Sequence, residues 1–168
     1  CTSPTLSLSF ENGCKLSSLQ KESFYGAPLS GTITLGASLT SIPDRAFGRI
    51  TGTYSIVFET GSQLQSIGHS AFAQASTQTD GGLSGNLVLP ASLLTISDSA
   101  FFNQGTFSLS FESGSQLTSI GDGAFQQSGL SGNVVFPSSV TTVGGNIVRD
   151  CTSPTLSLSF ENGCKLSS

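Results

Sequence analysis

The stretch Phe107-Ser-Leu-Ser-Phe-Glu-Ser-Gly-Ser-Gln-Leu-Thr-Ser-Ile-Gly-Asp-Gly-Ala-Phe125 carries the pattern that decides the fold of the chain. Apolar residues alternate at Phe107, Leu109 and Phe111, which predicts a short strand with one buried face. A Gly then predicts a turn, and a Leu and an Ile three residues apart lead toward the final Phe. Because Asp122 is a good N-cap residue, we expect a short helical turn before Phe125.

The same pattern recurs at intervals of 22 to 31 residues along the whole chain, and residues 1–18 return unchanged at 151–168. A single unit cannot bury its apolar side chains alone, whereas stacked units bury them against one another. We therefore predict one solenoid over residues 1–168, with about six and a half repeats. The strand anchors are Phe10, Leu35, Phe58, Leu89, Phe111, Phe136 and Phe160.

Two types of repeat alternate along the chain. The first type has a Glu after its strand, as in Phe111-Glu112, and the second has Leu-Ser-Gly before its strand, as in Leu130-Ser-Gly132. Both types continue through an Ile, Leu or Val to a position five residues later that is nearly always Phe. This phenylalanine column comprises Phe24, Phe47, Phe72, Phe101 and Phe125, with Val148 in its place in the sixth repeat.

The segments Leu64-Gln-Ser-Ile-Gly-His-Ser-Ala-Phe72 and Leu117-Thr-Ser-Ile-Gly-Asp-Gly-Ala-Phe125 resemble the BspA-like leucine-rich repeats. The resemblance covers the whole chain, and the segment Gly144–Val148 departs from it because Ala-Phe is missing there. It implies an α/β, β-rich, right-handed solenoid. One parallel sheet would form the concave side, and loops with short helical or 3-10 turns the convex side. It also implies a surface protein that binds other proteins and adheres to cells or matrix, with no catalytic residue to carry over.

The charge pattern limits the possible partners. Charged residues make up 10% of the chain, the net charge is −4, and the six basic residues are scattered. A nucleic-acid surface needs clustered Lys and Arg, so we expect no nucleic acid as partner. No apolar run approaches the roughly 18 residues of a transmembrane helix, so we expect no membrane insertion in this segment. Together with the resemblance, this composition favours an extracellular or cell-surface location.

Four cysteines, at Cys1, Cys14, Cys151 and Cys164, occupy copied positions in the two duplicated ends. The simplest of the three possible pairings joins Cys1 to Cys14 and Cys151 to Cys164. Free buried thiols are the alternative. A zinc site is not expected, because no CxxC spacing or nearby His accompanies them.

The outward positions of the strands form the candidate binding surface. They are small and neutral, without aromatic or Arg anchors, so a solvated face, a weak extended contact and an ordered-water face all fit. We expect this surface to be nearly flat. Its candidate residues are Ser7, Ser9, Thr34, Ser55, Val57, Asn86, Val88, Ser108, Ser110, Asn133 and Val135.

One insertion interrupts the regular spacing, between Ala75 and Gly82. We expect its residues Thr77, Gln78, Thr79 and Asp80 to project as a loop, either as a tolerated surface insertion or as a recognition element.

The remaining polar columns give no sign of catalysis, a metal site or a cofactor. Glu11, Glu59, Glu112 and Glu161 end alternate strands, about 10 Å apart, which is too far for shared coordination of one calcium ion. We expect these carboxylates to be solvated. His69 is the only histidine and shares a column with aspartates, and no carboxylate is placed in sequence to orient it as a catalytic base.

The two ends of the chain show apolar strands without polar caps, and the chain starts at Cys1, so we expect a processed piece of something longer. End-to-end contact would involve Leu6, Leu8, Phe10, Leu156, Leu158 and Phe160. The leading hypothesis is therefore a non-enzymatic surface protein that mediates protein binding or adhesion. The alternative is a structural fibre or spacer built from end-to-end stacked copies of itself.

Overall fold

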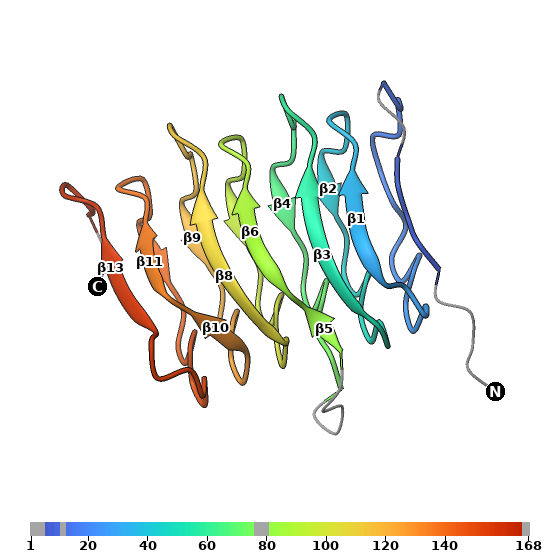
Figure 1. Cartoon of the computed structure of the whole chain (residues 1–168). Coiled ribbons are helices and arrows are strands. Elements are labelled where there is room, and N and C mark those ends of the chain that lie inside the picture. The colour runs from blue at the N-terminus through green and yellow to red at the C-terminus, as the bar shows by residue number, and fades with distance from the viewer. Residues whose placement is uncertain (1–5, 11–12, 76–80, 166–168) are drawn as a thin grey trace.

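The computed structural model describes residues 6–10, 13–75 and 81–165, and these form a parallel-strand β-solenoid with one turn per repeat (Figure 1). This confirms the predicted leucine-rich-repeat solenoid. Long strands lie along one side and most of the two-residue strands along the other. The longer elements are β1 (Gly31–Leu35), β3 (Thr53–Phe58), β6 (Gly85–Leu89), β8 (Thr106–Phe111), β10 (Gly129–Ser131), β11 (Asn133–Phe136) and β13 (Ser157–Phe160). The short elements are β2 (Ser41–Ile42), β4 (Ser66–Ile67), β5 (Gly82–Leu83), β7 (Thr95–Ile96), β9 (Ser119–Ile120) and β12 (Thr142–Val143).

The long strands pair in parallel and in register. β1 pairs with β3 from Gly31 opposite Tyr54 to Leu35 opposite Phe58, and β6 with β8 and β11 with β13 pair in the same way. Burial alternates as the sequence predicts: in β3, Tyr54 and Ile56 are buried, whereas Val57 points outward. Each buried side chain therefore packs on its counterparts in the neighbouring repeats.

The long strands form three hydrogen-bonded sheets instead of the single sheet that the sequence predicts. β5 pairs with β3 of the preceding repeat, whereas β6 pairs with β8 of the following repeat. The change of partner occurs at the Leu-Ser-Gly segment, where Gly85 has a φ of 79°, a conformation that glycine adopts at little cost. Gly132, also with a φ of 79°, separates β10 from β11 in the same way. The sheets are β1-β3-β5, β10-β8-β6 and β11-β13.

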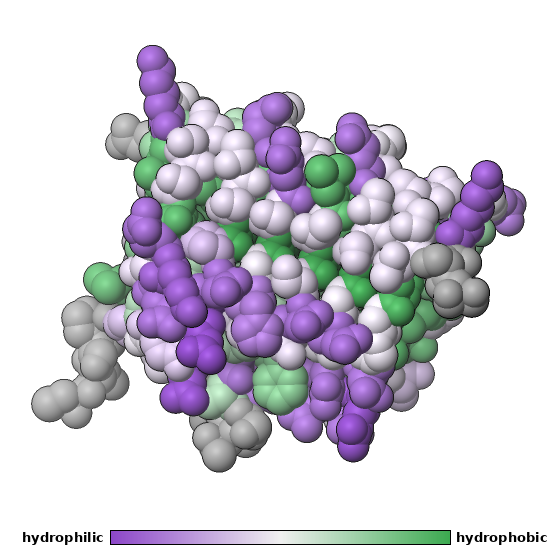
Figure 2. Space-filling view, turned by 180° about the vertical axis from the view of Figure 1, so that it is seen from behind, coloured by the Kyte–Doolittle hydropathy of each residue, from purple (hydrophilic) through white to green (hydrophobic). Residues whose placement is uncertain are grey.

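The short strands other than β5 form one five-stranded parallel sheet on the other side of the solenoid, in the order β12-β9-β7-β4-β2. Their second residues, Ile42, Ile67, Ile96 and Ile120, align and are buried. Figure 2 views the molecule from this side and shows a row of hydrophobic surface between rows of polar side chains.

No α-helix or 3-10 helix occurs in the described ranges, so the prediction of short helical turns was wrong. In the segment after β2, Arg45 and Arg49 have φ values of 54° and 55°, and a left-handed residue at every fourth position interrupts a helix. The Gly48 amide bonds to the Arg45 carbonyl within the turn (3.0 Å), while the Phe47 amide bonds across to the Ala71 carbonyl of the next repeat (2.8 Å). The segment is thus a series of tight turns that form ladders with their neighbours.

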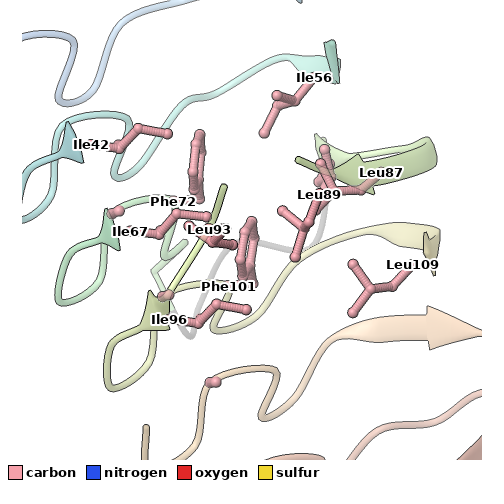
Figure 3. Packing of buried hydrophobic residues seen from close by; sticks show 14 of the residues in the cluster. Ile42, Ile56, Ile67, Phe72, Leu87, Leu89, Leu93, Ile96, Phe101 and Leu109 are labelled. Atoms are coloured by element: carbon pink, nitrogen blue, oxygen red, sulfur yellow. The ribbon is translucent and has the colours of Figure 1, made fainter. Parts of the chain in front are cut away.

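The core lies between the two layers of strands, and the phenylalanine column runs through it. Ring centroids from Phe24 to Phe125 are 5.1 to 5.4 Å apart, with interplanar angles of 6° to 12°. Figure 3 shows Phe72 and Phe101 stacked in this way, with Ile67 and Ile96 of the short strands beside them. The predicted column is confirmed, and Val148, which replaces Phe in the sixth repeat, is half-buried.

Candidate functional site

The predicted binding surface lies on the outer side of the long strands, and we call it the strand face. Val57, Val88 and Val135 are the large apolar residues on it, with exposed fractions of 48%, 40% and 41%. Strand pairing places Thr34 beside Val57 and Val88 beside Ser110. None of the predicted residues is buried: Ser7, Ser9, Thr34, Ser55, Val57, Asn86, Val88, Ser108, Ser110, Asn133 and Val135.

The polar side chains of the strand face bond to one another. The Ser55 hydroxyl lies 3.2 Å from that of Thr32 on the neighbouring strand, and the Ser108 hydroxyl donates to the Asn86 side-chain oxygen (3.0 Å). Such cross-strand pairs fix the side chains in place. The strand face is therefore an ordered, mainly polar surface on which exposed valines lie between hydrogen-bonded polar side chains.

The strand face is not as flat as the sequence predicts. A cleft of about 330 Å³ lies between β8 and β11, which are neighbouring long strands without hydrogen bonds to each other. Ser110, Asn133 and Val135 line it from the strands, and Glu112 and Glu161 line it from the ends of β8 and β13. The proposed binding surface thus contains a recess at a break in strand pairing.

The glutamate column caps turns of neighbouring repeats, although Glu112 and Glu161 remain exposed as the sequence predicts. One carboxylate oxygen of Glu59 accepts a hydrogen bond from the Ala37 amide of the preceding repeat (2.9 Å). Glu112 and Glu161 accept from Ala91 and Ser138 in the same way, each at 2.9 Å, and Glu11 lies outside the described residues. Across the described part of the chain, no group of three or more His, Cys, Asp or Glu side chains is placed to hold a metal ion.

The aspartate column also joins neighbouring repeats. Asp44 accepts a hydrogen bond from the His69 amide (2.9 Å), and Asp122 accepts one from the Gly145 amide (2.7 Å). Asp122 was predicted to cap a helical turn within its own repeat, and the structure shows that it caps the next repeat instead.

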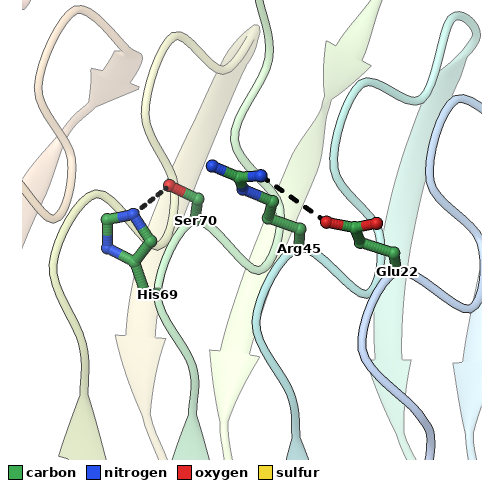
Figure 4. Close-up of polar contacts among 4 residues, drawn as sticks. All are labelled: Glu22, Arg45, His69 and Ser70. Carbon is green, nitrogen blue, oxygen red and sulfur yellow. Dashed lines mark hydrogen bonds and ion pairs between the residues drawn. The ribbon is translucent and has the colours of Figure 1, made fainter.

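His69 is exposed and contacts one hydroxyl, because its Nε2 lies 3.2 Å from Ser70 Oγ (Figure 4). In residues 6–10, 13–75 and 81–165, no carboxylate bonds to the imidazole ring. A Ser–His pair without an orienting carboxylate lacks one part of a hydrolytic triad. The geometry therefore offers no ready nucleophile at this position.

The cysteines in the described residues are free. Cys151 Sγ donates to the Phe125 carbonyl (3.1 Å), and Cys164 Sγ donates to the Val140 carbonyl (3.0 Å). The proposed bond between Cys151 and Cys164 is thus not formed in this structure, and Cys14 is also a free thiol. The proposed partner of Cys14, Cys1, lies outside the described residues.

A buried polar cluster beside the insertion was not predicted from the sequence. The Gln104 side-chain oxygen accepts from the Tyr54 hydroxyl (2.9 Å) and from the Leu83 amide (2.8 Å), and its nitrogen donates to the Phe72 carbonyl. Burial raises the pKa of Tyr54. Gln104 thus ties together the chain on both sides of the insertion, whose residues Thr77, Gln78, Thr79 and Asp80 lie outside the described residues.

The residues predicted for end-to-end contact are more exposed than the rest of the core. Leu6, Leu158 and Phe160 are 52%, 37% and 37% exposed. Leu8, Phe10 and Leu156 are half-buried against the core. Stacking of copies through these residues stays a prediction.

Parallel strands stacked one per repeat, with columns of Leu, Ile and Phe in the core and a regular outer face, define a leucine-rich-repeat solenoid. The chain belongs to the family described as BspA type leucine rich repeat region, which matches in six copies over residues 2–81 and 82–166.

A solved structure, entitled the crystal structure of pneumococcal vaccine antigen PcpA, is similar to this chain at 29% identity with a TM-score of 0.65. The match covers 95% of this chain and 35% of that chain, so this chain spans about a third of the antigen's length. No curated protein matches. No helix in the described residues is both long and apolar enough to cross a membrane.

Proposed function

We propose that this chain is a non-enzymatic, extracellular or cell-surface repeat protein that binds a protein or matrix ligand through its strand face. Membership of the BspA type family and similarity to a pneumococcal antigen support this proposal. Regular solenoids commonly use such an extended surface for binding.

The main support for this proposal is the set of exposed valines on the otherwise polar and ordered strand face. Val57, Val88 and Val135 occupy equivalent outward positions on β3, β6 and β11. A ligand that covers them removes apolar surface from water on three strands at once, which is favourable at about 25 cal/mol per Å². The cleft beside Val135 adds a recess in which a ligand side chain can be anchored.

A binding screen with a matched pair of variants tests the proposal. The chain is immobilised, and purified extracellular-matrix proteins and whole cells are tested as ligands. Lysine is then placed at Val57, Val88 and Val135 together, and we expect affinity to fall at least about tenfold, or 1.4 kcal/mol.

The control variant adds the same charge away from the strand face, by placing lysine at the exposed Gln63, Gln65 and Gln116. We expect this control to bind within about twofold of the wild type, since rim charges have small effects on affinity. Equal loss of binding in both variants would contradict the strand face as the binding site. An enzymatic activity lost on His69→Ala would contradict the non-enzymatic assignment.

A further inference from the structure

A second recess lies on the turn side of the first four repeats, away from the long strands. It has a volume of about 410 Å³, and we call it the turn trough. Residues from four consecutive repeats line it, from Tyr25 through Arg45 and His69 to Ser99. Three strand spacings of about 4.8 Å make this a span of about 14 Å.

The trough arises from a change of side-chain size along one column. The position that follows each Phe of the phenylalanine column holds Tyr25, Gly48, Ala73 and Phe102 in successive repeats. Two small residues therefore lie between two aromatic ones, and all four line the trough. This arrangement gives the trough a low floor with an aromatic residue at each end.

Gly48 allows the Tyr25 ring to lie against the backbone of the next repeat. A Cβ atom at Gly48 would come within 3.0 Å of the ring. The Arg49 guanidinium sits over the same ring, 5.8 Å from its centroid, as in a cation–π contact. The ring thus holds the guanidinium in position at the edge of the trough.

Positive charge gathers here in a protein whose net charge is −4. Arg45 and Arg49, two of the six basic residues, line the trough together with the only histidine, His69. Figure 2, which looks at the back of the molecule, shows strongly hydrophilic side chains across the N-terminal half of this side.

The two arginines differ in their partners. Arg45 forms an exposed ion pair with Glu22 at 3.5 Å, and Figure 4 shows these two side chains in a row with Ser70 and His69. Arg49 forms no ion pair with a carboxylate of the described residues. A guanidinium is a fork of donors that matches a carboxylate, so Arg49 is available for an external one.

We propose that the turn trough binds an acidic peptide segment, with a carboxylate of the ligand on Arg49. A span of about 14 Å matches some four residues of extended peptide, at about 3.3 Å per residue. A single acidic sugar would fill only part of that length. Arg45 binds a second carboxylate in exchange for Glu22, and the aromatic ends of the trough contact the aliphatic parts of the ligand. The site does not depend on the strand face, so either proposal can fail without the other.

The test uses a peptide of four glutamates, blocked at both ends, and the same peptide made with glutamine. Binding is measured by calorimetry at about 0.15 M salt, where the Debye length of about 8 Å screens distant charges. We expect the glutamate peptide to bind and the glutamine peptide to bind at least about tenfold more weakly. Arg49→Gln should weaken binding of the glutamate peptide about fivefold or more.

Two further variants separate the trough from general attraction to positive charge. Arg149→Gln removes an arginine from the turn side of the sixth repeat. Arg149 lies outside the trough and forms an ion pair with Asp150, so this change should alter binding less than about twofold. Glu22→Gln removes the competing carboxylate and should tighten binding, an effect that a purely structural role of the ion pair would not produce.

Three results would overturn the proposal. The first is equal weakening by Arg49→Gln and Arg149→Gln, which would show nonspecific attraction. The second is absence of binding by the glutamate peptide to a folded wild-type chain. The third is Arg49-dependent binding of a hyaluronan oligosaccharide without binding of the peptide, which would assign the trough to acidic glycans.

Discussion

At the scale of single residues, Asp and Gly are coupled between neighbouring repeats. Asp44 is followed one repeat later by Gly68, and Asp98 is followed by Gly121. A Cβ atom at Gly68 would lie 2.8 Å from both the carboxylate and the amide of Asp44. Where the column holds His69 instead, the next repeat has Ser97. Glycine is thus needed at the position where the aspartate of the preceding repeat accepts a hydrogen bond from the backbone of the next repeat.

A double-mutant cycle tests this coupling. We expect Asp44→Ala to cost about 1 kcal/mol of the free energy of unfolding, since one hydrogen bond is lost. Gly68→Ala should cost about 2 kcal/mol through crowding. The double variant should lose at least about 0.5 kcal/mol less than the sum, because without the carboxylate the repeats can separate slightly. Urea unfolding measures all three values, and strict additivity would rule out the coupling.

The thiols give a second prediction at this scale. Cys151 and Cys164 donate to different carbonyls and are not bonded to each other. Both should therefore react with iodoacetamide when the chain is unfolded without reductant. Peptide mass mapping measures this modification, and a linked pair of peptides containing the two cysteines would refute the prediction.

The sequence reveals which residues share a column of the solenoid, but it does not reveal all of their hydrogen-bond partners. Leu, Ile and Phe columns could be predicted because burial repeats with the period of the chain. The bonds of Asp44 and Glu59 to neighbouring repeats could not, because a capping residue looks the same whichever amide it caps. The coupling of Gly68 and Gly121 to the preceding aspartates is a signal in the sequence that could have identified the aspartate bonds.

At the scale of elements, the strands agree with the alternating pattern and the turns do not agree with the expected helices. Non-glycine residues such as Arg45, Ser70 and Ser99 adopt left-handed conformations that their residue types do not predict. Bonds to the next repeat stabilise them. The change of strand partner at Gly85 is easier to predict from the sequence, because the Gly of each Leu-Ser-Gly motif has a positive φ.

The phenylalanine column forms a continuous stack of rings through the core. Phe72 is fully buried between Phe47 and Phe101, so Phe72→Ala should cost about 3–5 kcal/mol of unfolding free energy. Phe24→Ala is the matched control and should cost less than half as much, since Phe24 is half-buried and stacks on Phe47. Urea unfolding compares the two, and similar losses would contradict the importance of stacking on both sides.

The turn trough also belongs to the scale of elements. Its sequence signal is the series Tyr25, Gly48, Ala73 and Phe102, each of which directly follows a residue of the phenylalanine column, but the recess that this series forms is visible only in the structure. The charges were visible in the sequence but scattered along it. Stacking of repeats brings Arg45, Arg49 and His69 to one recess, although more than 20 residues separate the first from the last.

At the scale of the whole molecule, one solenoid presents two chemically different sides. The strand face carries small polar side chains and exposed valines, and it contains the cleft between β8 and β11. The turn side carries the basic trough. The sequence predicted the strand face residue by residue, but the cleft depends on a break in strand pairing that only the structure shows.

The most direct test of the central claim, that the strand face is the binding surface, uses valine methyl signals in nuclear magnetic resonance. The chain is labelled at its valines and titrated with a ligand that the binding screen identifies. We predict that the signals of Val57, Val88 and Val135 shift on binding, while those of Val143 and Val148 on the turn side stay in place. Shifts at Val143 and Val148 with unchanged signals from the strand-face valines would contradict the claim.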